Sequence, residues 1–194
     1  EIVHSPSRKQ FSFRECELHG KHNAENVMVA LAVAEELGLP WSNLAKSIQQ
    51  FRAPGHRCEK IREFNGVTFI NDSKSTNLHS LQSALTGQEA TTVLIVGGKQ
   101  KGLDFEELIP FLDEKIRHTV CIGEIGASVA SLWEAHVPTS IASSMDEAVQ
   151  AAFSKAREGD VVLFSPGTSS FDMYSGYIAR GENFRRAVES LGVS

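Results

Sequence analysis

The spacing of apolar positions changes near residue 54, and this change divides the sequence into two parts. Before it, apolar residues recur at intervals of three and four, which predicts amphipathic helices at His22–Gly38 and Trp41–Phe51. The stretch Arg52-Ala53-Pro54-Gly55 then combines proline with glycine, a break that ends a helical unit. We therefore place a domain boundary between residues 1–54 and residues 55–194.

The opening twenty residues lack such a pattern. The segment EIVHSPSRKQFSFRECELHG is polar, begins without methionine and offers few positions for a hydrophobic core. We expect this sequence to be a piece of a longer protein, in which residues 1–54 are the helical remnant of a preceding domain.

Beyond the boundary, strand-like and helix-like segments alternate. Two strand-like runs, Cys58–Phe64 and Val67–Ile70, flank Asn65-Gly66, a dipeptide that tolerates positive φ and predicts a β-hairpin. Further strands are predicted at Thr92–Val96, His118–Ile122, Thr139–Ala142 and Val161–Phe164. Helices are predicted at Leu78–Leu85, Phe105–Ile116, Glu124–Trp133, Met145–Arg157 and Gly181–Leu191.

Solid apolar strands separated by single helices are typical of a parallel sheet that is covered on both faces. The predicted fold class is therefore α/β. We expect a Rossmann-like open, mostly parallel sheet with helices on both faces and right-handed connections, starting with the β-hairpin.

Composition and charge narrow the classes of function. The 194 residues carry a net charge of −5, so a general nucleic-acid-binding surface is not expected. No apolar run approaches the roughly 18 residues of a membrane span, and the start of the chain lacks a secretory signal. Cys16, Cys58 and Cys121 are too scattered for a disulfide framework or a zinc site, which favours a reducing cytoplasm.

Polar side chains collect directly after three predicted strands. Ligands of open α/β sheets bind beyond the carboxyl ends of the strands. The loops in that position are Asn71–Asn77 (NDSKSTN), Gly97–Gly102 (GGKQKG) and Ser165–Asp172 (SPGTSSFD). Their lysines, hydroxyls and backbone N–H groups suit carboxylates or phosphates, so together they predict a rim that binds an anionic ligand.

Helix capping is a structural alternative for two of these loops. Asp72 and Thr76 are equally suited to cap the helix that follows them, and Ser169-Ser170 to cap the last helix. The functional interpretation rests on the coincidence of polar residues in all three loops.

Other structural alternatives concern the glycines and lysines. Gly97-Gly98 can be a tight turn, since it lacks the GxGxxG spacing of a dinucleotide site, and Lys99 and Lys101 can be solvated charges. The sequence contains no GxxxxGK[ST] loop and no GxSxG elbow. His19 and His22 have no acidic or cysteine partner at metal-ligand spacing, so no metal site is expected.

The motifs, taken in order, resemble the Mur ligases, and within that family the ligases that add D-glutamate to UDP-N-acetylmuramoyl-L-alanine. The matching stretches are HNAEN (22–26), HRCE (56–59), GVTFINDSKSTN (66–77), LIVGGKQKGLDF (94–105) and LFSPGTSSFDMYSGYIARGENF (163–184). They span nearly the whole chain after Gly20. NDSKSTN discriminates most, because sister ligases that add a diamino acid or a dipeptide carry a DYAHNP-like loop there.

The resemblance implies a three-domain parent enzyme that forms an amide bond at the expense of ATP, in cytoplasmic peptidoglycan precursor synthesis. Residues 1–54 would be the tail of its ATP-binding middle domain, and residues 55–194 its C-terminal, amino-acid-binding domain. The P-loop and the residues that bind Mg²⁺ would lie mainly in the missing upstream region. We therefore expect this chain to be inactive alone.

The resemblance also implies residues for the nucleotide. Asn26 matches an amide that contacts adenine, and Asp72 a carboxylate that binds the ribose. Arg57 matches an arginine near the phosphates, and Lys74 a lysine beside the phosphate-transfer centre.

A second group of residues matches the part of the family that binds D-glutamate. Thr76 and Lys101 match groups that hold a carboxylate of D-glutamate, and Ser170, Phe171 and Tyr177 match a loop that closes over it.

Two positions depart from the family pattern. Tyr177 replaces an expected phenylalanine and adds a hydroxyl group, and Lys99 replaces an expected acid and makes the local field more positive.

Two other functions remain open. One is a different Mur-like ligase, such as a polyglutamylating enzyme, against which the loop Asp72–Asn77 argues. The other is a free-standing Rossmann-like module that binds a nucleotide or an anion. The helical segment Lys21–Phe51 argues against this second function, because it lacks a domain to pack on.

Overall fold

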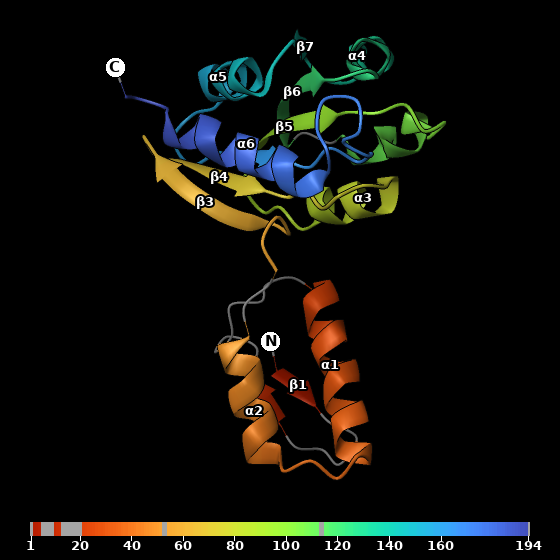
Figure 1. The fold of residues 1–194 in the computed structure, drawn as a ribbon, viewed down its shortest axis with the longest axis vertical. Helices are drawn as coiled ribbons and strands as arrows, with labels where there is room; N and C mark the ends of the chain where they lie inside the picture. The colour runs from red at the N-terminus through yellow and green to blue at the C-terminus, as the bar shows by residue number, and fades with distance from the viewer. Residues whose placement is uncertain (1, 5–9, 13–20, 52–53, 113–114, 194) are drawn as a thin grey trace. The chain divides into compact units, whose positions relative to one another are not determined.

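The computed structural model describes all residues except 1, 5–9, 13–20, 52–53, 113–114 and 194. The chain forms two compact units, Glu1–Pro54 and Gly55–Ser194, which divide at the Pro54-Gly55 step (Figure 1). Cys16, His19 and most of the opening segment lie outside the described residues.

The N-terminal unit pairs a small antiparallel ladder with two helices. Its elements are β1 (Ile2–His4), β2 (Gln10–Ser12), α1 (Lys21–Glu36) and α2 (Trp41–Gln50). Phe11 on β2 is only 3% exposed and belongs to one cluster with Val27 and Leu31 on α1. Among the described residues of the opening segment, Phe11 thus supplies a core position of this unit.

The C-terminal unit contains a six-stranded sheet in the order β3-β4-β8-β5-β6-β7. The strands are β3 (Glu59–Phe64), β4 (Val67–Asn71), β5 (Thr92–Gly97), β6 (Ile116–Ile122), β7 (Thr139–Ala142) and β8 (Val161–Phe164). Only the hairpin pair β3 and β4 is antiparallel. Asn65 and Gly66 at its turn both have positive φ, which confirms the reading of this dipeptide.

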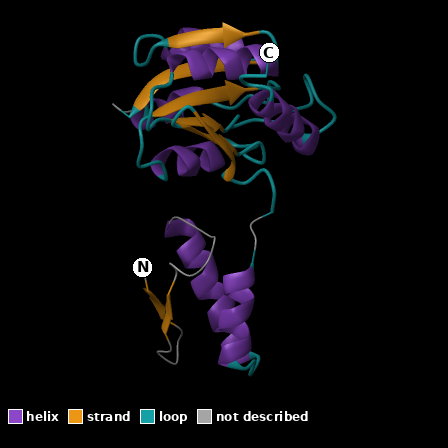
Figure 2. Cartoon of the chain, turned by 90° about the vertical axis from the view of Figure 1, so that its left-hand side faces the viewer, coloured by secondary structure: helices purple, strands orange, loops and turns teal. Residues whose placement is uncertain are grey.

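Helices cover both faces of this sheet, as predicted (Figure 2). On one face lie α5 (Met145–Lys155) and α6 (Tyr177–Glu189); on the other lie α3 (Leu78–Thr86), the 3₁₀ helix η2 (Phe105–Phe111) and α4 (Gly126–Trp133). Successive residues of a strand point to opposite faces, so Ile95 packs in one cluster and Leu94 in the other. The central strand β5 is buried along its whole length.

Two predicted helices differ from the structure. The segment Phe105–Ile116 is not one helix: its first part, Phe105–Phe111, forms a 3₁₀ helix, and Ile116 already begins β6. Pro110 explains this difference, since proline lacks a backbone donor and disfavours helical geometry in the residue before it. The last helix begins at Tyr177, about one turn before the predicted Gly181.

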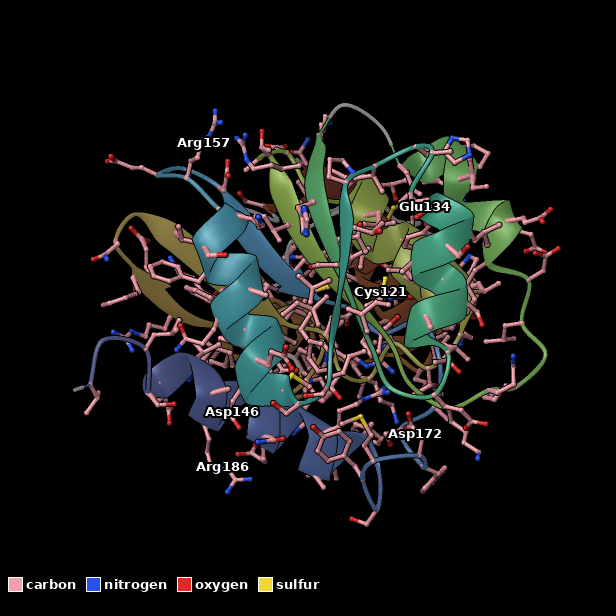
Figure 3. The ribbon with its side chains drawn as sticks, turned by 90° about the horizontal axis from the view of Figure 1, so that it is seen from above. Cys121, Glu134, Asp146, Arg157, Asp172 and Arg186 are labelled. Atoms are coloured by element: carbon pink, nitrogen blue, oxygen red, sulfur yellow. The ribbon has the colours of Figure 1, made fainter. Side chains whose placement is uncertain are left out.

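The strand order brings the three polar loops together. β8 lies between β4 and β5, so the loops that follow these three strands leave the same edge side by side. Asp72 N–H donates to Phe164 O at 2.7 Å, and Ser165 N–H donates to Ile95 O at 3.1 Å. Figure 3 shows Asp172 and Asp146 toward this carboxyl edge and Arg157 toward the opposite edge.

We predict that Ile95→Ala destabilises the C-terminal unit by about 2–5 kcal/mol, because it removes fully buried atoms from the central strand. Ile141→Ala is the matched control: Ile141 also lies on a strand but is 57% exposed, and its loss should cost less than about 1 kcal/mol. Both free energies of unfolding can be measured by urea unfolding in a Trp41→Phe background, with the fluorescence of buried Trp133 as the signal. Equal losses would contradict the assignment of β5 to the core.

Candidate functional site

The candidate site is the rim formed by the loops Asn71–Asn77, Gly97–Gly102 and Ser165–Asp172. Backbone contacts join the second and third loops: Lys99 N–H donates to Ser169 O at 2.9 Å, and the Thr168 hydroxyl donates to Lys99 O at 2.7 Å. A Cβ at Gly98 would lie 2.5 Å from Ser169 O. The glycine at this position is therefore required for close approach of the loops.

A buried arginine joins the first and third loops. Arg180 on α6 is 2% exposed; its Nε donates to Ser73 Oγ at 3.1 Å, and its Nη2 donates to Ser73 O at 2.9 Å and Thr168 O at 3.0 Å. Burial lowers its pKa to about 10, against the opposing effect of Asp172, so the guanidinium remains charged at neutral pH. Its Nη1 is buried without a hydrogen-bond partner among the described residues.

Asp72 is a buried carboxylate rather than a helix cap. It is 6% exposed; Oδ2 accepts from the Ser165 hydroxyl at 2.7 Å, and Oδ1 accepts from Cys58 N–H at 3.2 Å. Burial raises its pKa to about 6, and the hydrogen bonds from Ser165 and Cys58 oppose that shift.

Helix capping does not explain the polar residues of the rim. Asn77 caps α3, with its side chain accepting from Ser80 N–H at 2.8 Å. The capping alternative for Asp72 and Thr76 is therefore wrong. Gly176 stands at the N-cap of α6, so Ser169-Ser170 does not cap that helix either.

His56 is anchored beneath α6 by a network that defines its tautomer. Asn71 Oδ1 accepts from Ser73 N–H at 3.1 Å, so the amide nitrogen Nδ2 must be the group that faces His56 Nδ1 at 3.0 Å. An amide nitrogen only donates, hence Nδ1 accepts and the proton of the neutral ring lies on Nε2. Nε2 faces Glu182 Oε1 at 3.5 Å. A Cβ at Gly181 would collide with this ring.

Lys74 and Tyr177 meet at the same place. The Lys74 Nζ lies 3.9 Å from the centre of the Tyr177 ring, and Lys74 N–H donates to His56 O at 2.9 Å. Tyr177 O accepts from the Ser73 hydroxyl at 2.8 Å. Lys74 is thus held at the rim by its backbone and over an aromatic face by its ammonium group.

The two lysines of the second loop have different environments. Lys101 Nζ lies 3.4 Å from Thr76 O, so the structure brings these two predicted residues together, and Lys101 is exposed. Lys99 Nζ pairs with Glu124 Oε2 at 2.9 Å, and this hydrogen bond lowers the pKa of Glu124. The extra positive charge of Lys99 is therefore balanced locally.

The remaining predicted residues lie in different places. Ser170 is buried, Phe171 is 69% exposed on the third loop, and Arg57 is exposed next to His56. Asn26 is exposed on α1 of the N-terminal unit, so the rim is assembled without it.

An open pocket of about 520 Å³ lies at Phe171. Its lining residues are Lys99, Gly123, Glu124, Ala142, Ser143, Phe171, Asp172 and Met173.

Sequence reasoning missed the roles of Arg180 and His56. Both residues belong to motifs that match the family, but their hydrogen-bond partners lie far away in sequence, so the spacing of residues gave no signal.

Within the described residues, no three His, Cys, Asp or Glu side chains gather into a possible metal site. Cys58 and Cys121 are free thiols. None of the described helices has the length and apolar character needed to cross a membrane.

Comparison with known proteins identifies the family of this domain. Residues 56–167 match the model of the Mur ligase, glutamate ligase domain. A UDP-N-acetylmuramoylalanine--D-glutamate ligase of Nitrosomonas europaea is 43% identical over 178 residues, which cover 91% of this chain and 38% of the relative. The same-named ligase of Desulfitobacterium hafniense is 39% identical over 180 residues, covering 90% of this chain and 39% of the relative. The chain therefore spans about two fifths of the length of these relatives.

Solved structures share the fold at low sequence identity. A UDP-N-acetylmuramate-alanine ligase from Thermotoga maritima has a TM-score of 0.69 at 14% identity, covering 98% of this chain and 45% of that one. A Mycobacterium tuberculosis folylpolyglutamate synthase has a TM-score of 0.65 at 17% identity, covering 95% and 43%. At such identities the likeness concerns the fold alone.

We predict that Asp72→Asn stabilises the C-terminal unit at pH 8. The folded-state pKa of about 6 lies above the ordinary 3.8, so the folded protein binds more protons than the unfolded one between these values. Wild-type stability therefore falls as pH rises through this window, by up to about 3 kcal/mol. The amide has no charge to bury, so the advantage of the variant should shrink from pH 8 to pH 4.5.

Urea unfolding at the two pH values measures this difference. The control is Asp146→Asn, at an exposed position in the first turn of α5. An Asp72→Asn advantage that does not change with pH would show that the carboxylate carries no burial penalty.

We predict that Gly181→Ala disrupts the His56 anchor. Alanine in a helix interior normally gains about 1 kcal/mol over glycine, but here its Cβ must displace a buried ring, so we expect a net loss of about 1–3 kcal/mol. Gly176→Ala is the control, because a Cβ there meets nothing within 4 Å. NMR should show shifted His56 ring and Asn71 side-chain amide signals only in Gly181→Ala. Unchanged signals would refute this packing.

Proposed function

The chain belongs to the Mur ligase family, and on that premise we propose that it is the C-terminal part of an ATP-dependent ligase that joins D-glutamate to UDP-N-acetylmuramoyl-L-alanine. The observation that carries the proposal is the composition of the first loop. Its buried carboxylate, Asp72, its partly buried cation, Lys74, and its partly buried hydroxyl, Thr76, lie within five residues on one rim. A single loop can thus serve a nucleotide at one end and an amino acid at the other.

The nucleotide side of the rim consists of Asp72, Arg57 and Lys74. ATP supplies the phosphoryl group that activates the muramoyl-alanine carboxylate, and Mg²⁺, bound mainly by upstream residues, offsets phosphate charge. Each Asp72 oxygen accepts one hydrogen bond within the protein, which leaves lone pairs for the two ribose hydroxyls. Arg57 and Lys74 face the phosphates, and Asn26 contacts the adenine edge.

The amino-acid side of the rim consists of Thr76, Lys101, Ser170, Phe171 and Tyr177. Lys101 and Thr76 hold a carboxylate of D-glutamate through the ammonium group and the hydroxyl group. The 3.4 Å contact between Lys101 Nζ and the Thr76 carbonyl oxygen places the ammonium group beside this residue. Ser170 and Phe171 lie on the third loop and Tyr177 begins α6; these three residues close over the substrate. The contribution of this side is proximity and orientation: it presents the D-glutamate amine to the activated carboxylate.

Two observations support the proposal that the activity needs a longer protein. The chain spans about two fifths of its relatives. In addition, α1 and the residue after it expose four apolar side chains by 46–71%, namely Met28, Val29, Val33 and Leu37. Such a surface is suited to packing inside a larger domain. We propose that N-terminal and middle domains provide the phosphate cradle and the UDP-sugar site, and that the full enzyme works in the cytoplasm.

A coupled phosphate-release assay tests the function. The full-length ligase, supplied with ATP, Mg²⁺ and UDP-N-acetylmuramoyl-L-alanine, should release phosphate with D-glutamate and stay at background with L-glutamate or a diamino acid. This chain alone should stay at background with all three. Activity with a folate acceptor and glutamate instead would favour a polyglutamylating ligase, and turnover by the chain alone would overturn the need for upstream domains.

We predict that Lys101→Ala in the full-length ligase raises the KM for D-glutamate by about 10- to 100-fold, the value of one charge-assisted hydrogen bond. Lys99→Ala is the matched control from the same loop; its smaller effect is expected because its ammonium already pairs with Glu124. Steady-state kinetics at saturating ATP measure both variants. If Lys99→Ala raises the KM for D-glutamate more than Lys101→Ala does, the assignment of the D-glutamate carboxylate to Lys101 is wrong.

A further inference from the structure

The contact between Lys74 and Tyr177 is unusual because the ammonium group meets an aromatic face and no carboxylate. Its Nζ lies 3.9 Å from the ring centre, well inside the range of a cation–π contact. Within the described residues, Lys74 takes part in none of the ion pairs, whereas Lys60, Lys99, Arg117 and Arg185 each pair with an acid. The positive charge of Lys74 is held in place without being neutralised.

The backbones of both partners are held by hydrogen bonds, so the two side chains start from defined positions. Lys74 N–H donates to His56 O, and the next residue, Ser75, donates to Asp72 O at 2.8 Å. Tyr177 begins α6, and its carbonyl accepts from Ser73 Oγ, which in turn accepts from the buried Arg180. The edge of its ring also meets the His56 ring at 6.1 Å between centroids, with an interplanar angle of 77°.

This arrangement leaves the ammonium available to a ligand. An ammonium group has three N–H donors, and only the side turned to the ring is occupied. The other donors stay free for anionic oxygens, while the ring face attracts the charge and restricts a flexible four-carbon chain. A carboxylate in the same position would have restricted the chain too, but it would also have cancelled the charge.

We propose that Tyr177 is a positioning residue whose ring holds the Lys74 ammonium at the rim, ready to donate to a phosphate oxygen of the ligand. The inference rests on the proposed function for the identity of that ligand. It adds a role for the tyrosine ring that the amino-acid-binding role does not require. The ring face, and not the phenolic hydroxyl, performs this role, so phenylalanine can replace tyrosine while leucine cannot.

The first experiment uses the chain as it is and needs no activity. A proton above an aromatic ring resonates upfield, so NMR of the wild-type chain should show the Lys74 ε-CH₂ signals upfield of those of exposed Lys101. Tyr177→Phe should keep this shift, and Tyr177→Leu should abolish it while Lys101 is unaffected. Lys74 signals at an ordinary position in the wild-type chain would overturn the inference, whether or not the leucine variant folds.

The second experiment measures kinetics in the full-length ligase with D-glutamate saturating. Tyr177→Leu should lower kcat by about 2- to 30-fold, the range expected for one cation–π contact, and Tyr177→Phe should recover most of that loss. A phenylalanine variant as poor as the leucine variant would assign the effect to the hydroxyl and overturn the inference. If the ligase rejects D-glutamate but the chain keeps its ring shift, the proposed function fails and the positioning role stands.

Discussion

The placement of β8 between β4 and β5 is the constraint on which the rim depends. β8 is the last strand in the chain, yet its residue Phe164 pairs with Asn71 on one side and Ile95 on the other. Neighbouring strands lie only about 4.8 Å apart, so the loops that leave these three strands start side by side. The rim therefore does not exist in any part of the chain until the last strand has closed the sheet, and α6 then places Arg180 beneath the loops.

Three charged side chains of the rim differ from those of the rest of the domain, while Lys99 on the rim is paired with Glu124. Elsewhere Arg117 pairs with Asp160 at 2.7 Å and Arg185 with Glu59 at 2.7 Å, as stable surfaces usually do. At the rim, Arg180 donates hydrogen bonds to carbonyl groups and a hydroxyl group, and Asp72 is buried with a raised pKa. The ammonium group of Lys74 contacts the ring of Tyr177. Charges held without a counter-ion lower stability but remain available to a ligand, which is the usual compromise of a binding site.

Much of the architecture followed from local signals. Asn65-Gly66 predicted the hairpin because few other dipeptides tolerate two positive φ angles, and the solid apolar runs predicted β5 and β8 because only a doubly covered sheet buries both faces of a strand. The order of the motifs predicted the family. Local signals failed around Pro110, where a 3₁₀ helix stands in place of the predicted α-helix.

The sequence by itself therefore determined which residues form strands, which loops are polar and which chemistry those loops can offer. The tertiary structure decided that Asp72 is a buried carboxylate and Asn77 the helix cap, that Lys99 is paired and Lys74 is not, and that Arg180 and His56 support the rim. The physical reason is distance along the chain. Arg180 and Ser73 are 107 residues apart in sequence, and only the closed sheet brings such groups within hydrogen-bonding range.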